Sequence, residues 1–142
     1  MKRAAFLFSL GGLIPFIGLG VVAISSATYA SAAAGMQKDY AAAILAFLGA
    51  LHWGATVVEK LPTKHAWIAL AWGIVPPLWA VGVTGKPITL ALPWLAIGII
   101  LTLIADWAMR QWHSWPTWYL PLRLALTVGA ILGISLTMVA IG

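Results

Sequence analysis

The chain contains no cysteine, and charged residues make up only 8% of its 142 positions. The absence of cysteine excludes disulfides, thiolate nucleophiles and cysteine-ligated zinc or iron–sulfur clusters. The shortage of charge is equally restrictive, because a soluble domain has about a quarter of its residues charged to cover its surface. A water-soluble fold is therefore not expected.

Apolar residues take the place of the missing charges. They make up 63% of the chain, and the mean hydropathy is +1.01. They occur in blocks of about 20 residues, which is the length that crosses ~30 Å of hydrocarbon as a helix. We predict an all-α bundle of five transmembrane helices, forming a single domain over residues 1–142. The expected spans are residues 4–27, 40–58, 66–83, 87–106 and 121–141.

Prolines interrupt two of these blocks. The first block follows Lys2 and Arg3 as a signal peptide would, but it exceeds the ~7–15 apolar residues of such peptides, so we expect a membrane span. Pro15 lies inside it, and Pro76-Pro77 lie inside the third block. Proline removes a backbone donor and displaces the carbonyl four residues earlier, so both spans should bend or break there. Asp39 is expected to cap the start of the second helix.

The basic residues are distributed unequally between the two sides of the expected membrane. Six fall on the side of the N-terminus, and two fall on the opposite side. The six are Lys2, Arg3, Lys60, Lys64, Arg110 and Arg123, and the two are Lys38 and Lys86. The positive-inside rule then places the N-terminus in the cytoplasm and the C-terminus outside. Because these charges lie at segment ends and form no basic face, nucleic-acid binding is not expected.

Two sequence patterns suggest contact surfaces. Small residues recur every four positions in the second span, at Ala42, Ala46, Ala50 and Gly54, and predict a face for close helix packing. The segment between the fourth and fifth spans is rich in aromatics, which favours anchoring at the level of the lipid headgroups. The alternative is a docking surface for a partner or an amphiphilic ligand. The expected anchors are Trp107, Trp112, Trp115, Trp118 and Tyr119.

Ionisable residues gather towards one end of the spans. His52 lies within the second span, opposite the small residues, where an ionisable side chain usually faces protein or water. Glu59 returns to the same face, and Asp106, Arg110 and Arg123 lie at a similar depth. Such a cluster could pass protons or bind an anionic or quinone headgroup. The alternative is packing, with His52 bonded to Glu59 or to a proline-kinked helix, and Asp106 paired with Arg110 or Arg123.

The sequence offers little for a metal centre or an enzyme. The other histidines, His65 and His113, fall in expected loops, so His52 has no second imidazole for haem ligation. The acidic residues and histidines show no metal-ligand spacing, and the serines have no base nearby in sequence. No metal, catalytic residue or cofactor is predicted, and quinone or haem remain alternatives.

Three stretches resemble a known family. They are Gly11-Gly12-Leu13-Ile14-Pro15-Phe16, the run from Tyr40 to Gly54, and the run from Trp118 to Thr127. The resemblance is to the domain of unknown function 3429 family, which is related to transmembrane protein 69 of mitochondria. It extends along nearly the whole chain and differs around Val75-Pro76-Pro77-Leu78. It implies a small multi-pass protein of the bacterial inner membrane, and it implies no particular activity.

These observations favour a non-enzymatic protein that acts as an accessory, assembly or stabilising component of a larger inner-membrane complex. Its expected partners are the lipid bilayer and other membrane-protein subunits. One alternative is a small proton-coupled transporter with His52 and Glu59 as the relay. Another is a binder of a lipophilic ligand such as quinone or haem in the region of His52, Glu59 and Asp106.

Overall fold

The computed structural model describes all residues from 1 to 142, and its regular structure is entirely helical. The helices are α1 (Lys2–Gly11), α2 (Ile14–Ser25), α3 (Ala30–Val58), α4 (Thr63–Thr84), α5 (Ile88–Ala108) and α6 (Tyr119–Ile141). Because α1 and α2 together form one span, Lys2–Ser25, five helical segments are long and apolar enough to cross a membrane. This confirms the predicted all-α bundle of five spans.

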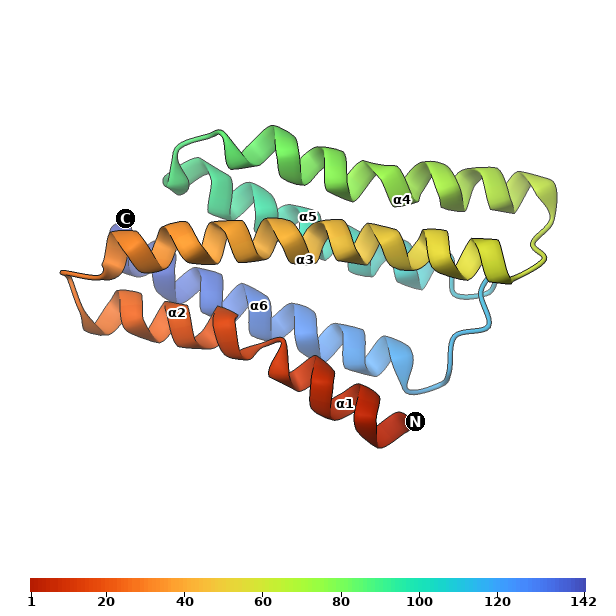
Figure 1. Ribbon diagram of the computed structural model, residues 1–142, viewed down its shortest axis with the longest axis horizontal. Helices are drawn as coiled ribbons and strands as arrows, with labels where there is room; N and C mark the ends of the chain where they lie inside the picture. Colours follow the sequence, from red (N-terminus) through yellow and green to blue (C-terminus); the bar gives the residue numbers. More distant parts are fainter.

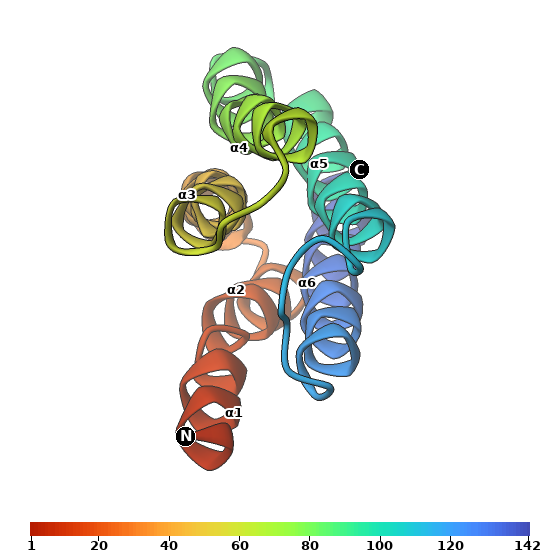
Figure 2. The ribbon, with the colours of Figure 1, turned by 90° about the vertical axis from the view of Figure 1, so that its right-hand side faces the viewer.

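Successive spans run in opposite directions along an elongated bundle (Figure 1). The N-terminus, the α3–α4 connection and the α5–α6 loop lie at one end, which we call the N-terminal end, and the C-terminus lies at the other. In the end view of Figure 2, α3 lies between α4 and α2, with α5 and α6 facing it. Helix α3 contacts α2, α4, α5 and α6, so it is the central helix of the bundle. This position agrees with the expectation that His52, which lies on α3, faces protein and not lipid.

The first span is interrupted next to Pro15. Helix α1 ends at Gly11, and α2 begins at Ile14 with Pro15 in its first turn. Proline fits the first turn of a helix because the amide hydrogen that it lacks would have no partner there. The Tyr40 hydroxyl donates to the Gly12 carbonyl at 2.6 Å and satisfies the backbone at the interruption. Figure 1 shows α1 leaning away from the direction of α2, which agrees with the expected kink.

Helix α3 begins earlier than the sequence suggested. It starts at Ala30 instead of near Tyr40, so Asp39 lies inside the helix and is not an N-cap. The polar residues that resembled a loop are accommodated on the helix. Gln37 Nε2 donates to the Phe16 carbonyl at 2.9 Å, Lys38 Nζ donates to the Thr84 carbonyl at 3.1 Å, and Asp39 is exposed.

Helix α4 continues unbroken through Pro76 and Pro77. The second proline leaves the Gly73 carbonyl without its helical donor. That carbonyl faces α3 at Gly49, since a Cβ added to Gly49 would lie only 2.6 Å from it. Of the two expected outcomes, a bend or a break, the break does not occur, and the freed carbonyl is covered by the backbone of α3 where the two helices approach closely.

The predicted stripe of small residues packs within this chain only at its start, where Ala42 lies against the apolar core. Ala42 and Ala46 are half-buried, and Ala50 and Gly54 are exposed. A Cβ added to Gly54 would meet no neighbouring atom within 4 Å. The buried face of α3 instead carries both small and large residues, among them Ala41, Leu45 and Gly49. The spacing of the small residues at Ala42, Ala46, Ala50 and Gly54 therefore did not identify the buried face of this helix.

The apolar core runs through the middle of the bundle and draws on every span. Its members are Phe16, Ala34, Ala41, Leu45, Ala80, Leu92, Leu95, Ile99, Ala130 and Ile134. Helix α2 approaches α6 closely where Gly20 faces the Gly133 carbonyl, because a Cβ on Gly20 would lie 2.5 Å from that oxygen. The polar residues lie mainly beyond this core, towards the N-terminal end.

Candidate functional site

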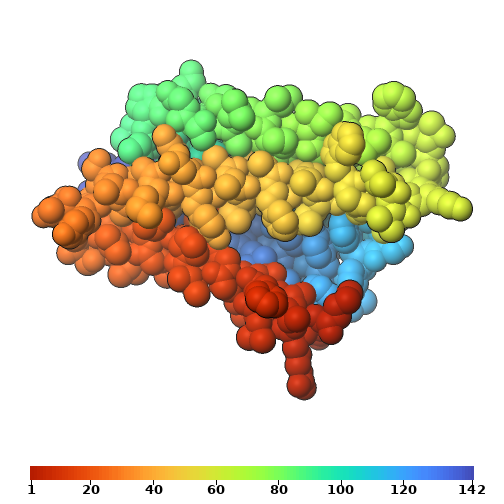
Figure 3. Space-filling view, viewed as in Figure 1, coloured from red at the N-terminus to blue at the C-terminus, as the bar shows by residue number.

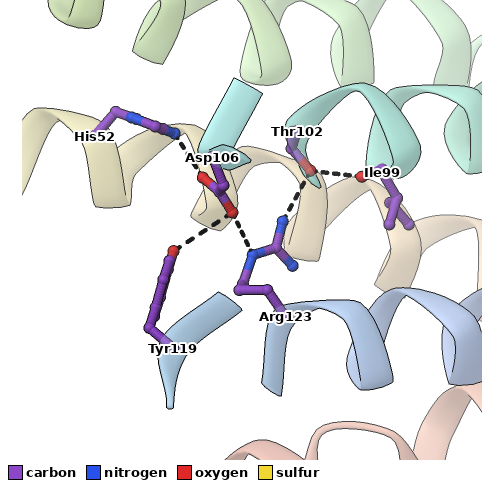
Figure 4. A network of polar contacts seen from close by, with 6 residues as sticks. All are labelled: His52, Ile99, Thr102, Asp106, Tyr119 and Arg123. Atoms are coloured by element: carbon purple, nitrogen blue, oxygen red, sulfur yellow. Dashed lines mark hydrogen bonds and ion pairs between the residues drawn. The ribbon is translucent and has the colours of Figure 1, made fainter. Parts of the chain in front are cut away.

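Asp106, near the end of α5, is the centre of a buried polar network (Figure 4). Arg123 Nε of α6 donates to Asp106 Oδ2 at 2.6 Å, and His52 Nε2 of α3 lies 2.8 Å from Oδ1. The Tyr119 hydroxyl lies 3.5 Å from Oδ2. The exposed fractions of His52, Asp106 and Arg123 are 0%, 2% and 4%. One carboxylate therefore joins three helices out of contact with solvent.

The charges in this network compensate each other. The Arg123 guanidinium stays protonated in proteins, so the Asp106 carboxylate is the anion that balances it. Arg123 Nη2 donates to Thr102 Oγ1 at 3.1 Å, and the Thr102 hydroxyl donates to the Ile99 carbonyl at 2.6 Å. Arg123 Nη1 alone of the guanidinium nitrogens donates no hydrogen bond within the protein.

The hydrogen-bond pattern fixes which nitrogen of His52 carries the proton. An ionised carboxylate only accepts hydrogen bonds, so Nε2, which faces Asp106, must be the N–H. Nδ1 of the neutral ring is then a hydrogen-bond acceptor. It is buried and has no partner within the protein. The inward orientation of His52 agrees with the sequence-based expectation, but its partner is Asp106 and not Glu59.

Glu59 pairs instead with His113, in the α5–α6 loop. His113 Nδ1 lies 3.0 Å from Glu59 Oε2, and the Ser114 amide donates to Oε1 at 2.9 Å. The loop folds back over the end of the bundle, so His113 is buried, contrary to the expectation of an interfacial loop residue. Its ring centroid lies 5.5 Å from that of His52, and Trp115 lies beside both rings.

Arg110 does not join the network, although the sequence suggested that it could. It is exposed, its guanidinium lies 4.0 Å from the centre of the Trp107 ring, and Nη1 donates to the Trp107 carbonyl at 2.7 Å. Asp106 therefore pairs with Arg123, the other candidate.

The aromatic residues of the loop divide into two groups. Trp107 is 59% exposed, as an anchor at the membrane surface would be. The others turn towards the protein, because Trp112 stacks on His65 at 4.2 Å and Trp115 stacks on Tyr119 at 4.4 Å. Trp118 lies 5.9 Å from the Phe6 ring of α1. The loop thus covers the polar network in addition to presenting an aromatic surface.

A cleft of about 290 Å³ lies on the other side of Arg123, between the α1–α2 interruption, α3 and α6. Its walls are mostly apolar, with Phe8, Phe16 and Phe47 among the lining residues, and Arg123 and Thr127 are polar members of the lining. The Thr127 hydroxyl is buried and has no partner. Figure 3 shows a hollow between α1, in red, and α3, in yellow, with α6 visible at its base in blue.

Sequence reasoning missed Thr102 and Thr127 as members of the site and treated His113 as a loop residue. A helical signal was available for the two threonines. Thr102 precedes Asp106 by four residues and Thr127 follows Arg123 by four, so each shares a helix face with a charged residue. The position of His113 depends on the path of the loop, for which no local pattern exists.

Comparison with known proteins supports the resemblance seen in the sequence. The family model described as "Protein of unknown function (DUF3429)" matches residues 1–139. Transmembrane protein 69 of Xenopus tropicalis is 33% identical over 131 residues, which is 91% of this chain and 51% of the relative. Transmembrane protein 69 of Mus musculus is 30% identical over 139 residues, 96% of this chain and 56% of the relative. The chain thus spans about half the length of these curated relatives, and no solved structure matches it.

Proposed function

The chain belongs to the DUF3429 family of membrane proteins of unknown function, and we propose that it binds an amphiphilic, lipid-soluble ligand in the cleft between α1, α3 and α6. The observation that carries this proposal is the position of Arg123. Arg123 is the charged residue in the lining of a mostly apolar cleft within the helical bundle. Ligand sites commonly combine apolar walls with a few polar groups that fix orientation.

The polar groups of the cleft have unused hydrogen-bonding capacity. Arg123 Nη1 donates to no protein atom, and the Thr127 hydroxyl, one helical turn further along α6, has no partner. Leaving a buried polar group unpaired costs about 1–3 kcal/mol. A ligand headgroup that accepts hydrogen bonds would satisfy both groups, while its apolar part would lie against the phenylalanines of the cleft.

The charge balance narrows the chemistry of this headgroup. Asp106 already neutralises Arg123, so the end of the cleft carries no net charge. A neutral acceptor such as the carbonyl of a quinone or an ester fits this arrangement better than a full anion, whose burial would need a further cation. His52 does not line the cleft, so the geometry supports the quinone alternative over haem ligation at His52.

We also propose that the chain lies in the bacterial inner membrane with its N-terminus in the cytoplasm. The support is the excess of basic residues at the N-terminal end. Arg123 is buried in its ion pair, but five basic residues at this end remain exposed, against Lys38 and Lys86 at the other. The five are Lys2, Arg3, Lys60, Lys64 and Arg110.

The role of a non-enzymatic accessory component in a larger membrane complex stays a prediction. Ligand binding in the cleft is compatible with this role. Large apolar side chains such as Phe47, Val57 and Val81 are exposed along the spans, where either lipid or another subunit could cover them. Purification in a mild detergent tests this expectation. Consistent recovery of the chain as a lone small species would contradict it.

The cleft can be tested with decyl-ubiquinone, a probe that combines carbonyls with an apolar chain. Quenching of tryptophan fluorescence should report its binding to the chain in nanodiscs. Thr127→Val, which removes one donor, should weaken binding roughly tenfold, equivalent to ~1.4 kcal/mol. Ser9→Phe, which places a bulky ring in the lining, should abolish it. The control is Thr137→Val, because Thr137 lies on α6 outside the cleft and bonds the Gly133 carbonyl. Equal binding by all variants would overturn the proposal.

A further inference from the structure

We propose that His52 and His113 share one enclosed water molecule, which links their two carboxylate partners into a proton relay between the buried network and Glu59. This proposal does not depend on the ligand cleft. It rests on three polar atoms around His52 that are buried and unpaired: His52 Nδ1, His113 Nε2 and Trp115 Nε1.

The donors and acceptors at this place can be assigned individually. His52 presents an acceptor at Nδ1, because its N–H faces Asp106. By the same reasoning His113 presents an acceptor at Nε2, because its Nδ1 faces the Glu59 carboxylate. Trp115 Nε1 can only donate. Two acceptors cannot bond each other, so these nitrogens need a molecule that donates two hydrogen bonds and accepts one.

A water molecule meets this requirement. Buried waters need two to four polar partners, and here one would donate to both imidazoles and accept from Trp115. The three rings are mutual neighbours, with centroid distances of 5.5 Å for His52–His113, 5.0 Å for His113–Trp115 and 6.3 Å for His52–Trp115. The Thr56 hydroxyl, four residues after His52 on α3, is also buried and unpaired.

The water would complete a continuous path for a proton. A proton on His52 Nδ1 passes to the water, the water passes one of its own protons to His113 Nε2, and His113 passes its Nδ1 proton to Glu59. Each step breaks one N–H or O–H bond and forms the next. The net change converts imidazolium His52 and ionised Glu59 into neutral groups, while His113 changes tautomer.

The surroundings of the path suit its two ends. Next to His52, the charged or titratable groups are Asp106 of α5, Arg123 and Tyr119 of α6, and His113 of the loop. Asp106 can stabilise a transient imidazolium on His52. The Glu59 side chain is 23% exposed at the N-terminal end, so this carboxylate can exchange protons with water outside the bundle.

A metal ion is the competing occupant, because histidines that bind metals usually donate their other N–H to a carboxylate. Two observations favour water. No group of three histidine, aspartate or glutamate side chains is arranged to hold a metal, and the Trp115 N–H has no lone pair to offer one. Tight binding of Zn²⁺ or Cu⁺ that disappears in His52→Gln would therefore overturn the proposal.

The relay can be tested by NMR on the full chain in nanodiscs, with histidine labelled with ¹⁵N. We expect the Nε2–H tautomer for His52 and the Nδ1–H tautomer for His113. We also expect exchange of the His52 ring N–H proton with solvent to slow by about tenfold or more in His113→Gln. This factor corresponds to ~1.4 kcal/mol added to the activation barrier for exchange. His65→Gln is the control, since His65 stacks on Trp112 at the same end, outside the path.

A second variant keeps the test decisive if His113→Gln does not fold. Glu59→Gln still accepts a hydrogen bond from His113 but cannot take up a proton, so it too should slow exchange at His52. Unchanged exchange in a folded His113→Gln, or in Glu59→Gln when only that variant folds, would refute the relay. Equal slowing in His65→Gln would also refute it.

Discussion

Arg123 Nε and Asp106 Oδ2 form a 2.6 Å ion pair between α6 and α5, and both side chains are at most 5% exposed. A buried pair of this kind costs desolvation energy and is weak evidence of stabilisation in itself, but loss of one partner leaves the other charge uncompensated. The pair also places the guanidinium between two neighbouring regions. One is the network of histidines and carboxylates, and the other is the cleft that we propose as a ligand site.

Asp106→Asn should destabilise the bundle by about 3–5 kcal/mol, because it leaves Arg123 buried without a counter-ion. Thermal unfolding in detergent, followed by circular dichroism, would measure the loss. The double variant Asp106→Asn/Arg123→Gln removes both charges and should recover a substantial part of it. The single variant Arg123→Gln completes the comparison. If the losses of the two single variants simply add in the double variant, Asp106 and Arg123 are not energetically coupled and this account is wrong.

The fold and the inward direction of His52 could be predicted because they follow from long-range composition and from the cost of an unpaired imidazole in hydrocarbon. Local polarity was misleading in α3. Gln37, Lys38 and Asp39 suggested a loop, yet two of them bond to other helices and the third is exposed. The stripe ending at Gly54 was also misleading, because spacing alone does not show which face of a helix is covered.

The two histidine–carboxylate pairs have the same separation in the sequence. His52 and Asp106 are 54 positions apart, and so are Glu59 and His113. Helices α3 and α5 run in the same direction, since a single span separates them (Figure 1). Glu59 lies just past the end of α3 and His113 lies in the α5–α6 loop, so the second pair depends on the path of the loop and not on the helix repeat. Sequence reasoning compared residues on the same helix and so paired His52 with Glu59.

Gly49→Ala should destabilise the chain by about 1–3 kcal/mol, the usual cost of overpacking. The added Cβ would lie 2.6 Å from the Gly73 carbonyl, so α3 and α4 would have to separate. Gly54→Ala is the matched control, because a Cβ there meets no atom within 4 Å and alanine favours the helix by up to ~1 kcal/mol. Unfolding midpoints of the two variants can be compared directly. Equal losses would show that the face at Gly54 is packed as closely as the face at Gly49.

A reporter fused after Gly142 should lie outside the cytoplasm, because the basic residues concentrate at the opposite end of the bundle. Only a reporter that is active outside the cytoplasm should therefore give a signal from this fusion. A second fusion between Lys60 and Lys64, in the α3–α4 connection, should report the cytoplasm. Alkaline phosphatase and green fluorescent protein give opposite signals in the two compartments and serve as a matched pair. Cytoplasmic fluorescence from the Gly142 fusion would reverse the proposed orientation.

His52→Gln and His52→Leu should differ sharply in stability, because Asp106 requires an N–H from this position and not an imidazole as such. The glutamine amide can donate to Asp106 Oδ1, so the free energy of unfolding of this variant should lie within about 1 kcal/mol of that of the unmodified chain. Leucine cannot donate, and the carboxylate would lose one charge-assisted hydrogen bond, which should cost about 1.5–3 kcal/mol. Equilibrium unfolding of both variants measures the difference. Because glutamine cannot relay a proton, His52→Gln separates the two roles of this residue. It should retain the fold while ending proton exchange between the buried network and Glu59. Similar destabilisation by both substitutions would show that the shape of the imidazole ring, and not its N–H, holds α3 against α5.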